Sequence, residues 1–265
     1  MISIIIPVRN RTNFLFKTVE SICSQTYTDW EILIIDYGGT DNCESIKDMF
    51  PKESIQYFHI PEYGQWNLSR ARNIGIRKAR GDIIVSLDSD ILLDKNVLKV
   101  LSDYIKCYEN RYIYQIQRTN ITENNKYETQ PLNSFLGCFQ ATTKDNFMKI
   151  RGFNEDLVLY GWEDQEIIDR FKRIGVNQYW LPGIKIYHQY HPSNPGMNTW
   201  PNRFRSWLNK SYLANDENWG YEYEKKPSLK EKLWRVFDFI VISIIIRPIK
   251  LIKKCIRYVR SGKWV

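Results

Sequence analysis

The chain has 265 residues, of which 43% are hydrophobic and 26% charged, and its formal net charge is +8. This length fits one large α/β domain or one domain with an appendage, and the hydrophobic fraction is sufficient for a sizeable core. Residues 225–265 contain 12 Lys and Arg but only 2 Asp and Glu, whereas the preceding 224 residues contain 26 and 28. Because the body is close to neutral, its composition argues against a nucleic-acid-binding protein.

Neither a zinc site nor a disulfide framework is indicated by the cysteines, which are odd in number and form no Cys-x-x-Cys pair. They are Cys23, Cys43, Cys107, Cys138 and Cys255. We therefore expect a reducing, cytosolic setting. The chain passes directly from Met1 into a strand pattern, so we expect no signal peptide.

The first ninety residues alternate between apolar runs and amphipathic segments. The patterns predict strands at 3–8, 30–35, 55–60 and 83–87, and helices at 13–25, 42–49 and 67–79. Apolar runs without a polar face are typical of parallel strands covered on both sides. The sequence thus predicts an α/β fold with a Rossmann-like, mostly parallel central sheet flanked by helices.

Beyond residue 90 the pattern is less regular. We predict helices at 93–108 and 164–175, strands at 112–117, 137–141, 176–181 and 185–188, a polar loop at 119–134 and a mobile loop at 192–206.

Residues 229–260 form a basic amphipathic helical appendage in this prediction. Their longest nearly apolar stretch, Val236 to Ile246, has eleven residues and contains Asp238, whereas a membrane span needs about 20. A basic amphipathic helix fits the surface of an anionic membrane, and we expect peripheral association. A helix that covers the core, or a dimer contact, is the alternative.

Two carboxylates follow the strand at 83–87 in an Asp-x-Asp pattern, Asp88-Ser89-Asp90. Side chains at i and i+2 of an extended segment point the same way, and open α/β sheets bind ligands beyond the carboxyl ends of their strands. Hard oxygen ligands suit Mg²⁺ or Mn²⁺. An Asp-rich turn without a metal is the alternative.

Four segments resemble glycosyltransferase family 2 in order and spacing: residues 3–10, the strand that ends at Asp36, residues 69–75 and residues 87–90. The segment 160–164 and the later His188 resemble the β-1,4-galactosyltransferases and bacterial chondroitin-polymerase-like enzymes. The resemblance covers residues 1–210 and implies a GT-A type fold. It further implies a nucleotide-binding half at 1–95 and an acceptor-binding half at 96–210, followed by a linker and tail at 211–265.

The resemblance also implies roles for individual residues. The nucleotide-sugar donor would be bound by Pro7, Arg9, Asp36, Arg72, Asn73 and Asp88. Mn²⁺, or Mg²⁺, would be bound by Asp90 and His188, with Asp88 contacting the metal or its water. His191 is a weaker candidate ligand, and we interpret His59 as structural. A structural role is also the alternative for His188, although imidazole is a common metal ligand.

Catalysis would depend on the pair Glu163-Asp164 at the start of a predicted helix. In the resemblance Asp164 is the base that takes the proton of the acceptor hydroxyl, and Glu163 orients the acceptor beside Tyr160 and Trp162. Acidic residues in a first helical turn also complement the helix dipole, which is the alternative explanation.

The function implied is an inverting, metal-dependent transfer of a hexose or N-acetylhexosamine, with a galactose-type sugar favoured, from a UDP-sugar to a glycan. Tyr37 and Gly39 stand where the family commonly has a second Asp and a small hydroxyl residue, so guanosine and thymidine donors remain open. We expect a lipid-linked acceptor in bacterial capsule, O-antigen or lipooligosaccharide synthesis at the cytoplasmic face of the inner membrane. A non-catalytic, membrane-associated carbohydrate-binding or scaffold subunit is the alternative.

Overall fold

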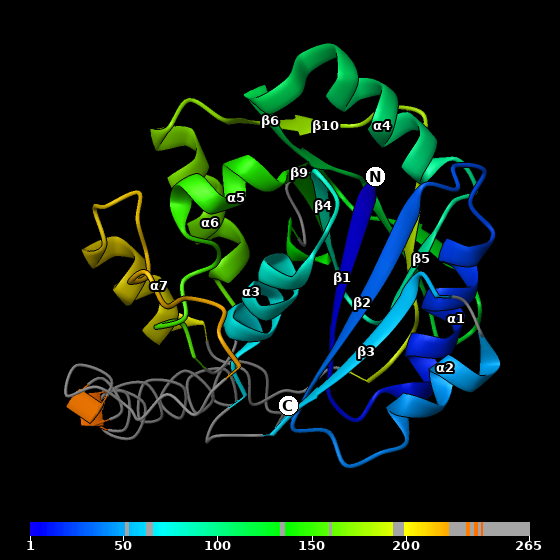
Figure 1. Ribbon diagram of the computed structural model, residues 1–265, viewed down its shortest axis with the longest axis horizontal. Helices are drawn as coiled ribbons and strands as arrows, with labels where there is room; N and C mark the ends of the chain where they lie inside the picture. The colour runs from blue at the N-terminus through cyan, green and yellow to red at the C-terminus, as the bar shows by residue number, and fades with distance from the viewer. Residues whose placement is uncertain are drawn as a thin grey trace, which may run out of the picture. The chain divides into compact units, whose positions relative to one another are not determined.

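The computed structural model describes residues 1–50, 53–61, 66–132, 136–158, 161–192 and 199–222, together with 232, 233, 236, 237 and 240 (Figure 1). Met1–Tyr223 form one compact unit and Glu224–Val265 a second. Most of the predicted amphipathic tail and the predicted acceptor-binding Tyr160 lie outside the described residues. Within the described part, no helix has both the length and the apolar character that crossing a membrane requires.

Strands and helices alternate from Ile2 to Leu87, as the sequence predicts for the first ninety residues. The strands are β1 (Ile2–Val8), β2 (Trp30–Tyr37), β3 (Ile55–Ile60), β4 (Ile83–Leu87), β5 (Ile91–Leu93), β6 (Tyr112–Gln115), β7 (Arg118–Ile121), β8 (Tyr127–Thr129), β9 (Phe139–Thr143), β10 (Asn177–Trp180) and β11 (Ile186–His188). The α-helices are α1 (Thr12–Cys23), α2 (Ile46–Met49), α3 (Leu68–Lys78), α4 (Val97–Tyr108), α5 (Lys144–Ile150), α6 (Glu163–Arg173) and α7 (Trp200–Leu208). Short 3₁₀ turns occupy Cys43–Ser45, Glu109–Arg111 and Leu136–Cys138.

The central sheet has seven strands in the order β10-β6-β9-β4-β1-β2-β3 (Figure 1). β1 pairs in parallel with β2 and β4, β2 with β3, and β10 with β6, whereas β9 is antiparallel to β4 and β6. The predicted mostly parallel α/β architecture is therefore confirmed. Because β1 to β4 run in one direction, their carboxyl ends meet at one edge of the sheet.

Alternation along β1 divides the core between the two faces of this sheet. Ile4 and Ile6 pack in a cluster that includes Leu15 of α1 and Leu101 of α4. Ile5 belongs to the opposite cluster, to which α3, α5 and α6 contribute Ala71, Ile74, Phe147, Ile150, Ile167, Ile168 and Phe171. Helices on both faces explain why the strand has no polar side chain facing solvent.

A second, four-stranded sheet has the order β5-β11-β7-β8 and corrects two predictions. The segment 119–134 is not a continuous loop, because Thr119 pairs with Tyr187 on one side and with Thr129 on the other. The helix predicted at 93–108 begins only at Val97, since Ile91–Leu93 pairs antiparallel with β11. Tertiary pairing thus overrides the polar local pattern.

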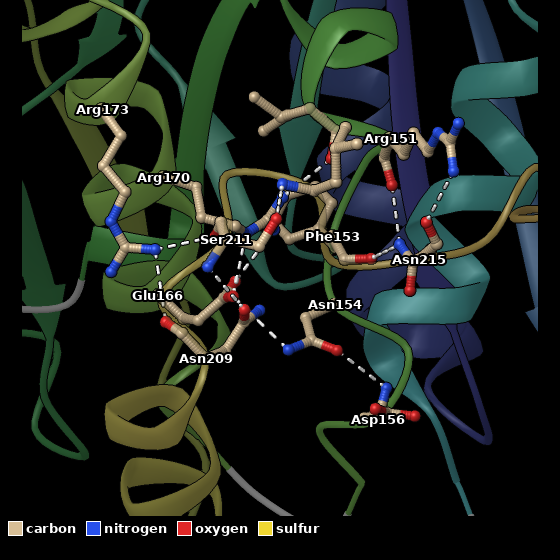
Figure 2. A network of polar contacts seen from close by, with 12 residues as sticks. Arg151, Phe153, Asn154, Asp156, Glu166, Arg170, Arg173, Asn209, Ser211 and Asn215 are labelled. Atoms are coloured by element: carbon tan, nitrogen blue, oxygen red, sulfur yellow. Dashed lines mark hydrogen bonds and ion pairs between the residues drawn. The ribbon is translucent and has the colours of Figure 1, made fainter.

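The compact unit also extends past the predicted boundary at residue 210. Asn215 donates from Nδ2 to the carbonyl oxygens of Arg151 and Phe153, at 2.6 Å each (Figure 2). Trp219 is 2% exposed within the core cluster that contains α3. Residues 211–223, predicted as the start of the linker and tail, therefore belong to the compact unit. In the predicted mobile loop at 192–206, residues 193–198 lie outside the described part and α7 begins at Trp200.

Candidate active site

Asp36 occupies a buried position near the end of β2, between Val8 of β1 and His59 of β3. Its carboxylate is 1% exposed and accepts hydrogen bonds from the Tyr57 hydroxyl at 2.7 Å and the Gly39 amide at 3.0 Å. The His59 Nδ1 atom lies 3.3 Å from the same carboxylate. Burial and the Asp36 charge raise the pKa of Tyr57, which therefore stays a neutral donor. The orientation of the carboxylate is fixed on three sides.

Asp90 lies in the turn between β4 and β5 and is the centre of a carboxylate–imidazole cluster. Its Oδ2 atom lies 2.5 Å from Arg11 Nη1, 3.2 Å from His191 Nε2 and 3.7 Å from His188 Nε2. The register that pairs Ile91 with His188 brings the end of β11 beside this turn. Among the described residues, one ligand atom from each of Asp90, His188 and His191 lies within 4.8 Å of the others.

The protonation states of Asp90 and His188 suit a divalent cation. Burial alone would raise the pKa of Asp90, but the hydrogen bond with His191 and the charge of Arg11 keep it lowered. Burial lowers the pKa of His188 to about 4, against the opposing effect of Asp90. The hydrogen bond to Asp90 raises the pKa of His191. At neutral pH Asp90 is thus ionised and His188 neutral, which are the forms that bind metal.

Arg72 of α3 holds two further acids beside this cluster. Its Nη2 atom donates to Asp88 Oδ1 at 2.9 Å, and its Nη1 atom lies 3.5 Å from Glu163 Oε1. The guanidinium is 1% exposed and stacks 5.0 Å from the centroid of the Phe153 ring. In the described part of the chain, its Nε and Nη1 atoms have no hydrogen-bond partner. Buried donors of this kind are suited to an anionic ligand such as a diphosphate.

The two acids beside Arg72 are held in an environment that opposes their ionisation. Burial and the neighbouring Asp90 and Asp164 carboxylates raise the pKa of Asp88, although Arg72 lowers it. Burial raises the pKa of Glu163 to about 7, and Asp164 adds to the effect while Arg72 counteracts it.

A left-handed turn places the acidic pair at the N-terminus of α6. Gly161 and Trp162 have φ angles of 74° and 77°. The Gly161 carbonyl accepts a hydrogen bond from Asn202 Nδ2 of α7 at 2.9 Å. Asp164 Oδ1 accepts from the Gln165 amide at 2.8 Å. The first turn of α6 therefore presents Glu163 and Asp164 where the helix dipole favours negative charge.

Gly137 joins the acidic pair to the Arg72 array. A Cβ atom at Gly137 would lie 3.3 Å from Asp164 Oδ2, so the glycine allows the Asp164 carboxylate to pack closely against this segment. The carbonyl of Gly137 accepts from Arg72 Nη2 at 3.2 Å. Asp164, Glu163, Arg72 and Asp88 thus form one group.

Four predicted site residues lie outside these groups. Asn73 is fully buried, and its amide bonds to the backbone of Phe153 and to Glu155 Oε1, so the structure gives it a positioning role. Pro7 is a buried residue of β1 paired with Ile35. Arg9 follows directly after β1, at the same sheet edge as Asp36. The Trp162 ring lies beneath the Arg203 guanidinium of α7, 4.9 Å away.

Sequence reasoning gave no role to Arg11 or Tyr57 and assigned His59 to a structural role. A signal for the last two exists in β3, because Tyr57 and His59 alternate at i and i+2 and so share a face. His59 is half exposed and faces Asp36. Arg11 carries no such signal, since it follows the strand by three residues and meets Asp90 only in the folded chain.

Comparison with known proteins identifies the family. Residues 3–180 match the model of Glycosyl transferase family 2. An uncharacterized glycosyltransferase of Rickettsia felis is 38% identical over 128 residues, which cover 48% of this chain and 20% of that protein. Chondroitin synthase of Escherichia coli is 25% identical over 240 residues, which cover 72% of this chain and 35% of that protein. The chain thus spans only a fifth to about a third of these two relatives.

The fold also matches solved structures. The crystal structure of GalNAc-T7 with UDP, GalNAc and Mn²⁺ superposes with a TM-score of 0.64 at 19% identity, covering 78% of this chain and 48% of that one. At this identity the likeness concerns the fold alone, which is the predicted GT-A type. With the family model matched over residues 3–180, the chain belongs to glycosyltransferase family 2.

Proposed function

We propose that the chain is an inverting, metal-dependent glycosyltransferase that transfers a sugar from a UDP-sugar to a glycan. The observation that carries this proposal is the adjacency of two groups at one sheet edge. The cluster of Asp90, His188 and His191 offers a metal site, and Asp88 two residues earlier belongs to the acid array around Arg72. In this arrangement a metal ion would stabilise the leaving diphosphate, and a neighbouring carboxylate would take the proton of the acceptor.

The donor set of the cluster fits Mn²⁺ better than Mg²⁺. Two of its three ligand groups are imidazoles, which bind through nitrogen, whereas Mg²⁺ prefers oxygen ligands. Asp90, His188 and His191 would hold the ion, with Asp88 contacting it or its water. A bound ion would neutralise the charge that develops on the nucleoside diphosphate as it leaves. The GT-A neighbour with UDP, GalNAc and Mn²⁺ supports this choice of metal.

Donor recognition is assigned to the ends of β1 and β2 and to α3. Asp36 would accept hydrogen bonds from the uracil ring or the ribose, with Pro7 and Arg9 lining the nucleotide. The Nε and Nη1 atoms of Arg72, which have no hydrogen-bond partner in the described part of the chain, would donate to the diphosphate. The Tyr37 ring is buried against Trp66, so the recognition of uridine depends on Asp36 rather than on a second acid.

The proton chemistry is assigned to Asp164, with Glu163 orienting the acceptor beside Trp162. One carboxylate must take the proton of the acceptor hydroxyl as it attacks the anomeric carbon. A Glu163 side chain with a pKa of about 7 is partly protonated at neutral pH and can donate a hydrogen bond to an acceptor oxygen. Tyr160 belongs to the proposed acceptor site by resemblance.

We further propose a role in bacterial surface polysaccharide synthesis, with a hexose or N-acetylhexosamine as the transferred sugar and a lipid-linked acceptor. The match to a chondroitin synthase supports a polymeric glycan product. The basic amphipathic segment 229–260 would attach the enzyme to the cytoplasmic face of the inner membrane. Release of the chain from anionic liposomes on deletion of residues 227–265 tests this attachment, and unchanged liposome binding would overturn it.

The main experiment is a donor screen that follows nucleotide release from UDP-, GDP- and dTDP-sugars with Mn²⁺. We expect release from a UDP-sugar and its loss in Asp164→Asn, with donor binding retained. Asp169→Asn, on the same helix, is the matched control and should keep activity. If the wild-type chain binds nucleotide-sugars but never releases nucleotide, the result favours a carbohydrate-binding scaffold instead. Normal turnover in Asp164→Asn would exclude Asp164 as the base.

A further inference from the structure

One face of α7 carries aromatic rings stacked with cations and continues from Trp162. The Arg203 guanidinium lies 4.9 Å from the Trp162 ring centroid. The rings of Phe204 and Trp207 stack with centroids 6.0 Å apart and planes 25° apart, and the Lys210 ammonium lies 5.4 Å from the Trp207 centroid. We call these five side chains the α7 surface.

The α7 surface is open to solvent and has one sign of charge. Trp207 is 63% exposed and the neighbouring Leu208 is 47% exposed. Because these two large apolar side chains are adjacent, they leave a contiguous apolar area in water, which is a feature of binding surfaces. Residues 199–213 include two exposed cations, Arg203 and Lys210, and no acidic residue. The charge is therefore complementary to an anionic ligand.

The α7 helix is also anchored at both ends to α6 and the turn before it, and the first turn of α6 contains the proposed base. At the start of α7, Asn202 donates to the Gly161 carbonyl at 2.9 Å. At its end, Arg173 of α6 donates from Nη1 to the carbonyl oxygens of Ser211 at 2.8 Å and Asn209 at 3.3 Å (Figure 2). The start of α7 thus lies near the start of α6, and the end of α7 near the end of α6. The α7 surface therefore runs from Trp162 toward Lys210.

Spacing along the helix sets what the surface can reach. Trp207 follows Arg203 by four residues, a displacement of roughly 6 Å along the helix axis. This is comparable to the length of one sugar ring, so a glycan that contacts Trp162 extends over the surface with its next unit. Aromatic rings pack against the apolar faces of sugars, while Arg203 and Lys210 can pair with carboxylate or phosphate groups.

We propose that the α7 surface binds an anionic portion of the acceptor glycan, next to the sugar that receives the transferred unit. The inference rests on the proposed function and specifies its acceptor class: a glycan that carries uronate carboxylates or phosphates. The surface contributes affinity and selectivity for the acceptor, and has no part in binding the donor.

The test measures glycan binding by calorimetry without donor, in wild type, Trp207→Ala and Lys210→Gln. The probes are a hexasaccharide of alternating glucuronate and N-acetylglucosamine, a ribitol phosphate hexamer and neutral chitohexaose. We expect at least one anionic probe to bind about tenfold more tightly than chitohexaose, and each variant to lose about tenfold of that affinity. Whichever anionic probe binds identifies carboxylate or phosphate as the recognised group. Binding should also weaken as salt is raised.

Tyr127→Ala is the matched control, because Tyr127 is a 67% exposed aromatic on β8, and it should bind the probes as wild type does. Melting curves establish that all variants are folded. Any of three results would overturn the inference. They are equal affinity for neutral and anionic probes, no binding of either anionic probe at millimolar concentration, and unchanged affinity in both Trp207→Ala and Lys210→Gln. Nucleotide release from the donor alone is measured in parallel, so a chain that is no glycosyltransferase is distinguished from one whose acceptor binds elsewhere.

Discussion

Replacing Glu163 with glutamine is expected to stabilise the folded chain at pH 7.5 and to leave its stability at pH 4.5 nearly unchanged. Burial, with the Asp164 and Asp88 charges, raises the pKa of Glu163 from 4.5 to about 7 in the folded chain in spite of Arg72. Between these pH values the folded state keeps a proton that the unfolded state releases. Raising the pH through this window therefore favours unfolding.

The cost is complete above pH 7 and amounts to about 3 kcal/mol, at about 1.4 kcal/mol for each pKa unit. Glutamine resembles the protonated acid and escapes this cost. Urea unfolding of wild type and Glu163→Gln, in EDTA from pH 4.5 to 7.5, should give a difference in unfolding free energy that grows from near zero to about 3 kcal/mol. Asp169→Asn on the same helix should show no such growth. If the difference in unfolding free energy stays constant or falls as the pH rises, the raised pKa of Glu163 is refuted.

Three other predictions concern the same unit. Arg170→Met should cost about 3–5 kcal/mol in urea unfolding, because it leaves the Glu166 carboxylate buried without its bidentate partner, and adding Glu166→Gln should recover part of the loss. His191→Ala should weaken Mn²⁺ binding about tenfold or more, with free Mn²⁺ measured by electron paramagnetic resonance. Unchanged affinity would show that His191 is not a metal ligand. A chain of residues 1–210 should melt well below one of residues 1–223 in circular dichroism, since it lacks a tryptophan that is 2% exposed, and equal melting would contradict the extended unit.

The parts of the site that sequence predicts best have local signals. The apolar run before Asp88 predicts β4 by itself, so the positions of Asp88 and Asp90 just after this strand follow from the local sequence. Glu163 and Asp164 follow Gly161-Trp162 at the start of a helical pattern, and α6 begins at Glu163. These placements depend only on neighbours in the sequence.

Other features depend on register and tertiary contact, which no local pattern encodes. Tyr57 meets Asp36 because β3 pairs with β2 in one register; a shift of one residue would turn the hydroxyl to the other face of the sheet. β7 is a strand because Thr119 finds partners on both sides. Asn73 stands beside Arg72 in the sequence, yet its amide bonds to the loop at 153–155 and positions that loop.

The dependence of the site on distant residues extends beyond the predicted domain boundary. Asn215 bonds to the carbonyl of Phe153, and the Phe153 ring lies beneath the guanidinium of Arg72. Arg72 in turn holds Asp88 and Glu163 and opposes the effect of burial, which disfavours their ionised forms. A Cβ atom on Gly152 would collide with Trp219, so the loop and the segment that follows α7 are packed without space. Residues 211–222 therefore support the acid array through Phe153, which explains why the compact unit extends past residue 210.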